Sequence, residues 1–186
     1  MQLADSRQRY DTLSIAMHWL MVALLVAVYA VVNLRESFPR GNPLRSELMT
    51  WHTMLGLSVL VMVMVRIVVR LTGPGAPPIL PELKRWQAVF SRVTHLALYA
   101  FMVSMPILGW LVIGAEGKDI PFFGLQLPPL TAIDKPFAHS VEDIHKTIGT
   151  IGYYLVGLHA AAALFHHHVV RDNTLSRMLL NRKAPQ

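Results

Sequence analysis

The sequence of 186 residues contains no cysteine, and only 15% of its residues are charged. Without cysteine the chain cannot hold a thiolate-bound iron–sulfur cluster, a thioether-linked c-type haem or a disulfide. No G-x-G-x-x-G or P-loop pattern follows a predicted strand, which argues against a soluble nucleotide-binding domain. Soluble domains carry about 25% charged residues. The composition therefore indicates a membrane protein, in which any redox chemistry depends on a bound cofactor.

Long uncharged stretches dominate the chain: 53% of the residues are hydrophobic, and four stretches of 18 to 24 residues lack Asp, Glu, Lys and Arg. A transmembrane helix needs about 20 such residues, whereas a barrel would have shorter, alternating strands. We therefore predict an all-α integral membrane protein, a four-transmembrane-helix bundle that forms a single membrane domain over residues 1–186. The expected helices cover about residues 12–35, 47–71, 91–115 and 140–171, with a long connector at 116–139.

The basic residues are distributed unevenly between the two ends of this bundle. The two tails and the middle connector carry 11 Lys and Arg, whereas the other two connectors carry 6. Because positive charge is retained on the cytoplasmic side, we expect cytoplasmic N- and C-termini in the bacterial inner membrane, with the 116–139 connector in the periplasm. The formal net charge of +6 then reflects orientation in membrane lipid and does not indicate a nucleic-acid partner.

Histidine is the residue type that suggests a function, because eight of the nine histidines lie within or at the ends of the predicted spans. His145 and His159 are 14 residues apart, which on a helix is a rise of about 21 Å with about 40° of rotation. They therefore share one face at two depths. In an antiparallel bundle, His145 is level with His52 and His159 is level with His18. Two pairs at two depths predict two b-type haems, each with its iron held by two imidazoles, an arrangement that favours electron transfer.

The same histidines allow other interpretations. A single histidine in a spanning helix is about as often a packed, hydrogen-bonded residue as a ligand, but four histidines matched in depth are harder to explain in that way. His95 is expected level with His18 and His159 and could replace either as a ligand. His166 follows His159 by seven residues, about 10 Å nearer the cytoplasm, where a quinone head group or a haem propionate could sit.

Several motifs carry a resemblance to a known family. They are Ser14-Ile15-Ala16-Met17-His18-Trp19-Leu20, then His52 with Gly56, then Gly157-Leu158-His159-Ala160-Ala161-Ala162-Ala163-Leu164-Phe165-His166-His167, and finally Arg171 before Asp172-Asn173-Thr174-Leu175. With these motifs the chain resembles the bacterial cytochrome b561 family from about Tyr10 to Met178, which is nearly its whole length. The resemblance implies a four-helix membrane cytochrome with two haems b.

The resemblance also implies which residues bind the two haems. His18 and His159 would hold the inner haem iron. His52 and His145 would hold the outer haem iron, in agreement with the depth argument. His95 would then be a non-ligand.

Similar cytochromes include a superoxide oxidase, which passes electrons from periplasmic superoxide through both haems to ubiquinone. By this resemblance we expect the same activity here, with the quinone bound near His166 on the cytoplasmic side. Ser58 and Trp19 are weaker candidates for contacts with the quinone.

Superoxide is an anion, so positive charge near the outer haem would steer it toward the protein. The two periplasmic connectors carry six basic and seven acidic residues, so steering requires a local cluster of positive charge. Arg45, Lys118, Lys135 and Lys146 are the candidates for that cluster.

Two other functions fit the same residues. Similar cytochromes serve as membrane subunits that take electrons from a partner dehydrogenase or hydrogenase, and such a redox protein would dock on the 116–139 connector. A non-redox transporter of metal ions or protons could also use histidines within the membrane, although no carboxylate lies within the spans to assist it.

Overall fold

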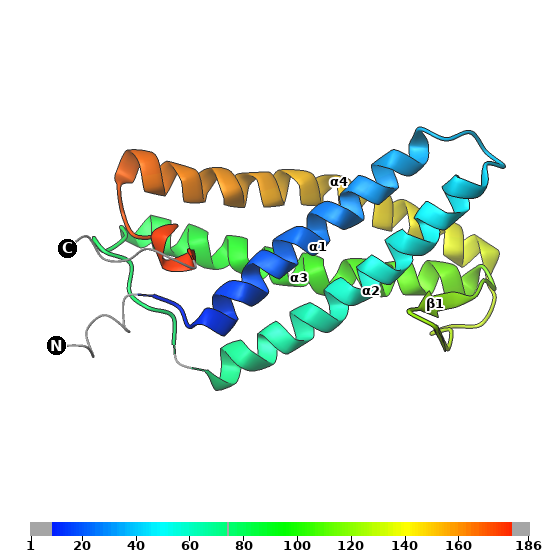
Figure 1. Cartoon of the computed structure of the whole chain (residues 1–186), viewed down its shortest axis with the longest axis horizontal. Helices are drawn as coiled ribbons and strands as arrows, with labels where there is room; N and C mark the ends of the chain where they lie inside the picture. The colour runs from blue at the N-terminus through cyan, green and yellow to red at the C-terminus, as the bar shows by residue number, and fades with distance from the viewer. Residues whose placement is uncertain (1–8, 74, 180–186) are drawn as a thin grey trace.

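The computed structural model describes residues 9–73 and 75–179 and is built mostly of helices. Four long helices cross the molecule side by side (Figure 1). They are α1 (Thr12–Glu36), α2 (Pro43–Thr72), α3 (Arg85–Ala115) and α4 (Lys135–Phe165). All four spans are long and apolar enough to cross a membrane. The prediction of a four-helix membrane bundle is therefore confirmed.

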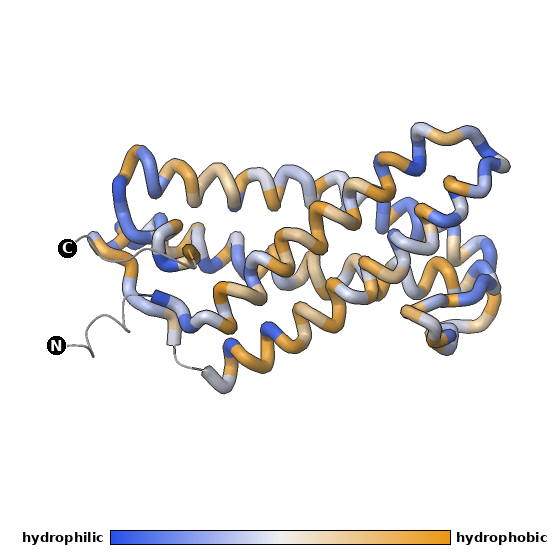
Figure 2. The backbone as a smooth tube through the Cα atoms, viewed as in Figure 1, coloured by the Kyte–Doolittle hydropathy of each residue, from blue (hydrophilic) through white to orange (hydrophobic). Residues whose placement is uncertain are grey.

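The bundle has two distinct ends (Figure 1). At one, here called the terminal end, the first and last described segments meet: the Tyr10 backbone N–H donates to the Arg177 carbonyl at 3.5 Å. The opposite end, here called the hairpin end, carries the α1–α2 loop and a short β-hairpin. α1 packs on α2, α2 on α3 and α3 on α4. Apolar residues dominate the middle of α1 and α2, and hydrophilic residues concentrate in the connectors (Figure 2).

Capping residues determine where the helices begin, and they lie outside the apolar stretches from which the spans were predicted. Asn42 caps α2 and Asp134 caps α4, each by accepting a backbone N–H of the first turn, at 2.9 and 3.0 Å. A proline follows each cap within the first turn, where it needs no hydrogen-bond partner. As a result α2 and α4 begin four and five residues earlier than expected, and the connector before α4 ends at Asp134 instead of residue 139. α3 begins six residues earlier than expected, after Lys84, whose backbone N–H donates to the Gln87 side chain at 3.0 Å.

The connector between α3 and α4 contains a two-stranded antiparallel sheet that the sequence analysis did not predict. β1 (Ile120–Phe122) pairs with β2 (Leu125–Leu127). The two turn residues, Phe123 and Gly124, have φ values of 46° and 87°, as tight hairpin turns require. Ile120 is 2% exposed, and β1 contacts both α2 and α3. The hairpin is therefore packed onto the end of the bundle.

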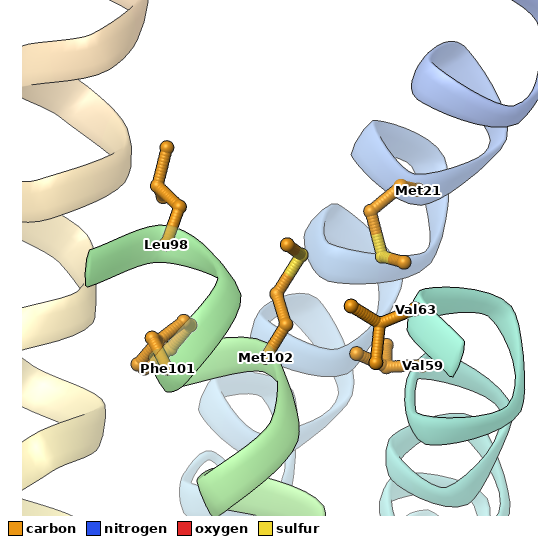
Figure 3. Close-up of a cluster of buried hydrophobic side chains, with 6 residues drawn as sticks. All are labelled: Met21, Val59, Val63, Leu98, Phe101 and Met102. Carbon is orange, nitrogen blue, oxygen red and sulfur yellow. The ribbon is translucent and has the colours of Figure 1, made fainter. Parts of the chain in front are cut away.

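A cluster of buried hydrophobic side chains forms the core of the bundle (Figure 3). It consists of six side chains from α1, α2 and α3: Met21, Val59, Val63, Leu98, Phe101 and Met102. Phe101 lies on the side of α3 nearest α4 (Figure 3). There, Gly152 makes room for its neighbours, because a Cβ at this position would collide with the Phe101 ring and the Tyr29 hydroxyl. The approach of α4 to the core therefore depends on this glycine.

Candidate functional site

The structure arranges four of the predicted histidines in two facing pairs. His52 on α2 faces His145 on α4 with 6.2 Å between ring centroids, and these two form the hairpin-side pair. His18 on α1 faces His159 on α4 at 6.3 Å, and these two form the terminal-side pair. A ligand nitrogen lies about 2 Å from its metal and roughly 1 Å from its own ring centre, so two imidazoles on opposite sides of one metal are about 6 Å apart. Both separations fit a metal ion between the rings.

The ligand set and the surrounding space fit a haem at these positions. Within residues 9–73 and 75–179, no group of three or more His, Cys, Asp or Glu side chains gathers at one point. Each pair therefore offers two protein ligands, the number that a bis-imidazole haem takes from its protein. One turn along α2 from His52, a Cβ on Gly56 would meet nothing within 4 Å. Open space thus adjoins the helix face that carries His52.

Contacts with neighbouring helices orient both rings of the hairpin-side pair. Nδ1 of His52 lies 3.3 Å from the Val28 carbonyl oxygen. Because a carbonyl only accepts, this contact favours the proton on Nδ1 and leaves Nε2 free to bind a metal. The His145 ring packs against α3 at Gly109, where an added Cβ would lie 3.4 Å from its Cε1. A larger residue at Gly109 would press on the His145 imidazole.

His95 lies next to the terminal-side pair, as its depth predicted. Its ring centroid is 5.3 Å from that of His159, compared with 6.3 Å between His18 and His159. Its Nδ1 lies 2.6 Å from the Ser91 carbonyl oxygen. The His95–His159 separation is shorter than the roughly 6 Å expected for two imidazoles on one metal. The geometry favours His18 as the partner of His159.

A reversal of the chain follows α4 at the terminal end. The helix continues as a π-helix over His166–Val170, and the chain then turns at Arg171, whose φ is 59°. This turn brings Asp172 against His166, with 2.5 Å between Oδ2 and Nδ1. The other carboxylate oxygen accepts the Thr174 backbone N–H at 2.8 Å. Burial raises the pKa of Asp172, but the hydrogen bonds from Thr174 and His166 outweigh it and hold that pKa below its usual value. Asp172 is therefore a carboxylate that orients the imidazole of His166.

The structure separates the two weaker candidates for quinone contacts. Trp19 lies at the terminal end, where its indole N–H donates to the Met178 carbonyl at 2.7 Å. Ser58 follows His52 on α2 by six residues, which is about 9 Å along the helix, and its hydroxyl donates to a carbonyl of its own helix at 2.8 Å. Ser58 thus lies between the levels of the two histidine pairs, whereas Trp19 and His166 lie toward the terminal end.

Two adjoining cavities open at the hairpin end and contain three of the four predicted steering residues, whereas the fourth, Lys146, pairs with Glu142 on α4 at 2.7 Å. The first cavity, of about 330 Å³, is lined by Glu116, Lys118, Lys135, Ala138, His139 and Glu142. The second, of about 460 Å³, is lined by residues that include Arg45 and Lys118. Glu142 precedes His145 by three residues on α4, so the first cavity adjoins the face of the hairpin-side pair. The structure thus brings Lys118 and Lys135 together in the first cavity, with Arg45 in the neighbouring one.

Acidic side chains balance part of this positive charge. Lys118 pairs with Glu116 at 2.7 Å, and Arg45 pairs with Glu36 at 3.2 Å. Arg45 also donates to the carbonyls of Arg35 and Phe38 at 3.0 and 2.8 Å, so its guanidinium holds the α1–α2 loop. The cavities are therefore polar and mixed in charge.

Sequence reasoning missed three residues near the paired histidines. The Tyr29 hydroxyl donates to the Gly149 carbonyl at 2.8 Å and so joins α1 to α4. Arg66 lies inside α2 and donates through Nε to the Tyr99 hydroxyl at 3.3 Å. Asp172 contacts His166, as described above. Two of them had a signal in the sequence: Arg66 is spaced 14 residues from His52, and Asp172 belongs to the Asp172-Asn173-Thr174-Leu175 motif.

Comparisons with known proteins agree with this arrangement. The family model described as prokaryotic cytochrome b561 matches residues 9–181. The chain is 31% identical to cytochrome b561 homolog 1 of Escherichia coli, over 94% of this chain and 99% of that protein. It is also 31% identical to a probable superoxide oxidase of Yersinia pestis, over 95% and 99% of the two chains. Cytochrome b561 homolog 2 of Escherichia coli is 27% identical, over 96% and 95%.

Proposed function

The chain belongs to the prokaryotic cytochrome b561 family, a family of membrane electron-transfer proteins that bind b-type haem, and from that premise we propose that it is a superoxide oxidase. In this proposal it takes electrons from periplasmic superoxide and delivers them through two haems to ubiquinone. The observation that carries the proposal is the two facing histidine pairs, at 6.2 and 6.3 Å, one beyond the other along α4. The probable superoxide oxidase among its relatives supports the choice of substrate.

The two histidine pairs supply the ligands of two redox centres. His52 and His145 hold an outer haem, and His18 and His159 hold an inner one. Bound haem supplies a reversible one-electron couple at its iron, and two imidazole ligands leave no open position for oxygen. About 21 Å of helix separates His145 from His159, within a hydrocarbon core of about 30 Å. The helices thus support electron transfer across most of the bilayer.

The orientation in this proposal follows from the distribution of charge. Counted between the four uncharged stretches of the sequence, the two tails and the middle segment carry 11 Lys and Arg, whereas the other two segments carry 6, so the terminal end is cytoplasmic by the positive-inside rule. The hairpin end then faces the periplasm of a bacterial inner membrane. The His52–His145 pair is the outer one in this orientation.

Superoxide reaches the outer centre through the first cavity at the hairpin end. Lys118 and Lys135 line this cavity and attract the anion, with Arg45 contributing from the adjoining cavity. Glu116 and Glu142 reduce the net charge of the cavity, so the attraction acts mainly at short range.

The quinone binds at the terminal end, where His166 donates a hydrogen bond to its head group. Asp172 accepts from Nδ1 of His166, which leaves Nε2 for the ligand, and Trp19 lies at the same end. Two superoxide anions give up two electrons and leave as two molecules of oxygen. The quinone gains these two electrons and takes two protons from the cytoplasm to become the quinol. His166 is the side chain that passes those protons.

The proposal is tested with the purified protein in mild detergent. We expect a dithionite-reduced minus air-oxidised spectrum of b-type haem with two haems per chain, and superoxide-driven reduction of ubiquinone. His145→Leu should lose one haem and this activity, whereas His168→Leu, at an exposed position beyond α4, should retain both. Unaltered superoxide-driven activity in His145→Leu would rule out the proposed route.

The second candidate function is an electron-transfer subunit that receives electrons from a partner dehydrogenase or hydrogenase. It is favoured by apolar side chains exposed on the hairpin, of which Phe123 is 58% and Leu125 is 63% exposed. A redox protein that copurifies with the cytochrome and reduces it in the absence of superoxide would support this function. Membership in an electron-transfer family leaves the transporter alternative without support.

A further inference from the structure

Arg66 is a charged residue inside a membrane-spanning helix, on the face of α2 that carries His52. These two residues are 14 positions apart, which gives a rise of about 21 Å with about 40° of rotation. The same spacing separates His145 from His159 on α4. At the depth where α4 presents its second histidine, α2 therefore presents an arginine.

The guanidinium of Arg66 is held in place but incompletely bonded. Its Nε donates to the Tyr99 hydroxyl on α3 at 3.3 Å. Its Nη1 is buried and has no hydrogen-bond partner in the described part of the chain. None of the ion pairs formed among residues 9–73 and 75–179 includes Arg66. Because a buried charge in a membrane helix needs a counter-charge, an anion from outside the chain is expected at Nη1.

We propose that Arg66 binds a propionate carboxylate of the haem held by His18 and His159. This inference rests on the haem assignment proposed above and identifies the residue that binds the carboxylate. Haem brings two propionates to its site, and guanidinium is the side chain best matched to a carboxylate, through paired, charge-assisted N–H···O bonds. Tyr99 occupies Nε and so fixes the direction in which Nη1 points.

An arginine at this position also influences the redox balance of the inner centre. Its positive charge compensates the propionate and favours the reduced state of the nearby iron over the oxidised state, which carries one more positive charge. Arg66 therefore raises the midpoint potential of the inner haem. It helps electrons to move from the outer pair to the inner one.

The test is an optical redox titration of the purified protein and its variants. His159→Leu first identifies the transition that belongs to the inner haem, because that transition should disappear. In Arg66→Gln the same transition should shift to lower potential, by about a tenfold change in the ratio of reduced to oxidised haem, which corresponds to about 59 mV. The other transition should not move. Arg92→Gln, which removes an exposed arginine from the same end of the bundle, is the matched control.

The possible outcomes separate this inference from the haem assignment. Selective loss of the inner haem in Arg66→Gln supports the inference, as does the shift. Unchanged potentials and haem content in that variant would overturn it. If Arg66→Gln does not accumulate, Tyr99→Phe decides, since it keeps the charge and removes only the hydrogen bond: a smaller shift of the same transition supports the inference, and no shift rejects it. Two intact transitions in His159→Leu would instead reject the haem assignment.

Discussion

Individual histidines of this chain differ in their surroundings more than in their depth. His18 and His95 are both near His159, yet only the His18 ring, at 6.3 Å, stands at a separation that fits a shared metal. His166 is distinguished by a carboxylate partner that is buried and fixed by the Thr174 backbone. The groups that contact each imidazole thus determine what that histidine can bind. Replacing a contacting residue should change the binding or proton transfer at the histidine even though the ring itself remains.

Asp172→Asn is a test of this kind for His166. The amide can still accept the Thr174 N–H, but it cannot offer His166 a negative charge. Because the folded pKa of Asp172 lies below its unfolded value, the carboxylate is fully charged at neutral pH, and its contribution to stability is lost only as pH falls through that lowered pKa. We expect quinone to reoxidise the pre-reduced haems about 10- to 100-fold more slowly, the range found when a partner that orients a functional histidine is removed.

The measurement is a stopped-flow experiment that follows haem absorbance after quinone is mixed with protein reduced in advance, across a range of pH. The haem content of the variant should equal that of the parent, and the pH at which the rate changes should move. Equal rates and an unmoved pH profile in Asp172→Asn would show that the His166–Asp172 contact has only a structural role.

At the scale of helices, the contact between α4 and the core depends on one small residue. Gly152 lies midway between His145 and His159, and a Cβ there would collide with Phe101 and Tyr29. Overpacking of this kind costs about 1–3 kcal/mol. We expect Gly152→Ala to lower the thermal stability of the haem-loaded protein, measured by loss of the Soret band on heating, since α4 carries one ligand of each pair.

Gly157→Ala is the matched control on the same helix. A Cβ at Gly157 meets nothing within 4 Å, and two residues of helix rotate it about 200° away from His159. Alanine is favoured over glycine in helices by up to about 1 kcal/mol, so this variant should be as stable as the parent or more stable. If Gly152→Ala and Gly157→Ala lost the Soret band at the same temperature, the position of α4 would not depend on the contact at Gly152.

The helices could be predicted from the sequence because long uncharged stretches are typical of helices in contact with lipid. The depths of the histidines could be predicted because the rise of about 1.5 Å per residue converts their spacing in the sequence into a distance along the helix. The hairpin could not, since Phe123 adopts a positive φ that non-glycine residues rarely take. The contact of Asp172 with His166 depends on the left-handed backbone conformation of Arg171, which the sequence did not predict because residues other than glycine rarely adopt it. Arg66 lies within both the expected helix 47–71 and α2, but the charge count assigns it to the middle connector because the uncharged stretch ends at Val65.

Across the whole molecule, the arrangement makes the proposed reaction sensitive to membrane voltage. The two histidine pairs are about 21 Å apart along the axis of α4, which is roughly two thirds of the thickness of a hydrocarbon core of about 30 Å. An electron that moves from the outer pair to the inner one therefore crosses most of the field. Moving one elementary charge across the whole membrane changes its free energy by about 2.3 kcal/mol per 100 mV. Moving one electron across two thirds of the membrane therefore changes its free energy by about 1.5 kcal/mol per 100 mV.

Protein reconstituted into vesicles with the hairpin end outside should respond to an imposed potential in a predictable direction. A potential that is negative inside opposes the inward movement of electrons, so superoxide generated outside should reduce ubiquinone more slowly, and an ionophore that collapses the potential should restore the rate. An ionophore that removes only the pH gradient serves as the control. If the quinone instead accepted electrons at the hairpin end, no electron would cross the field, and the rate would be the same at either sign of potential.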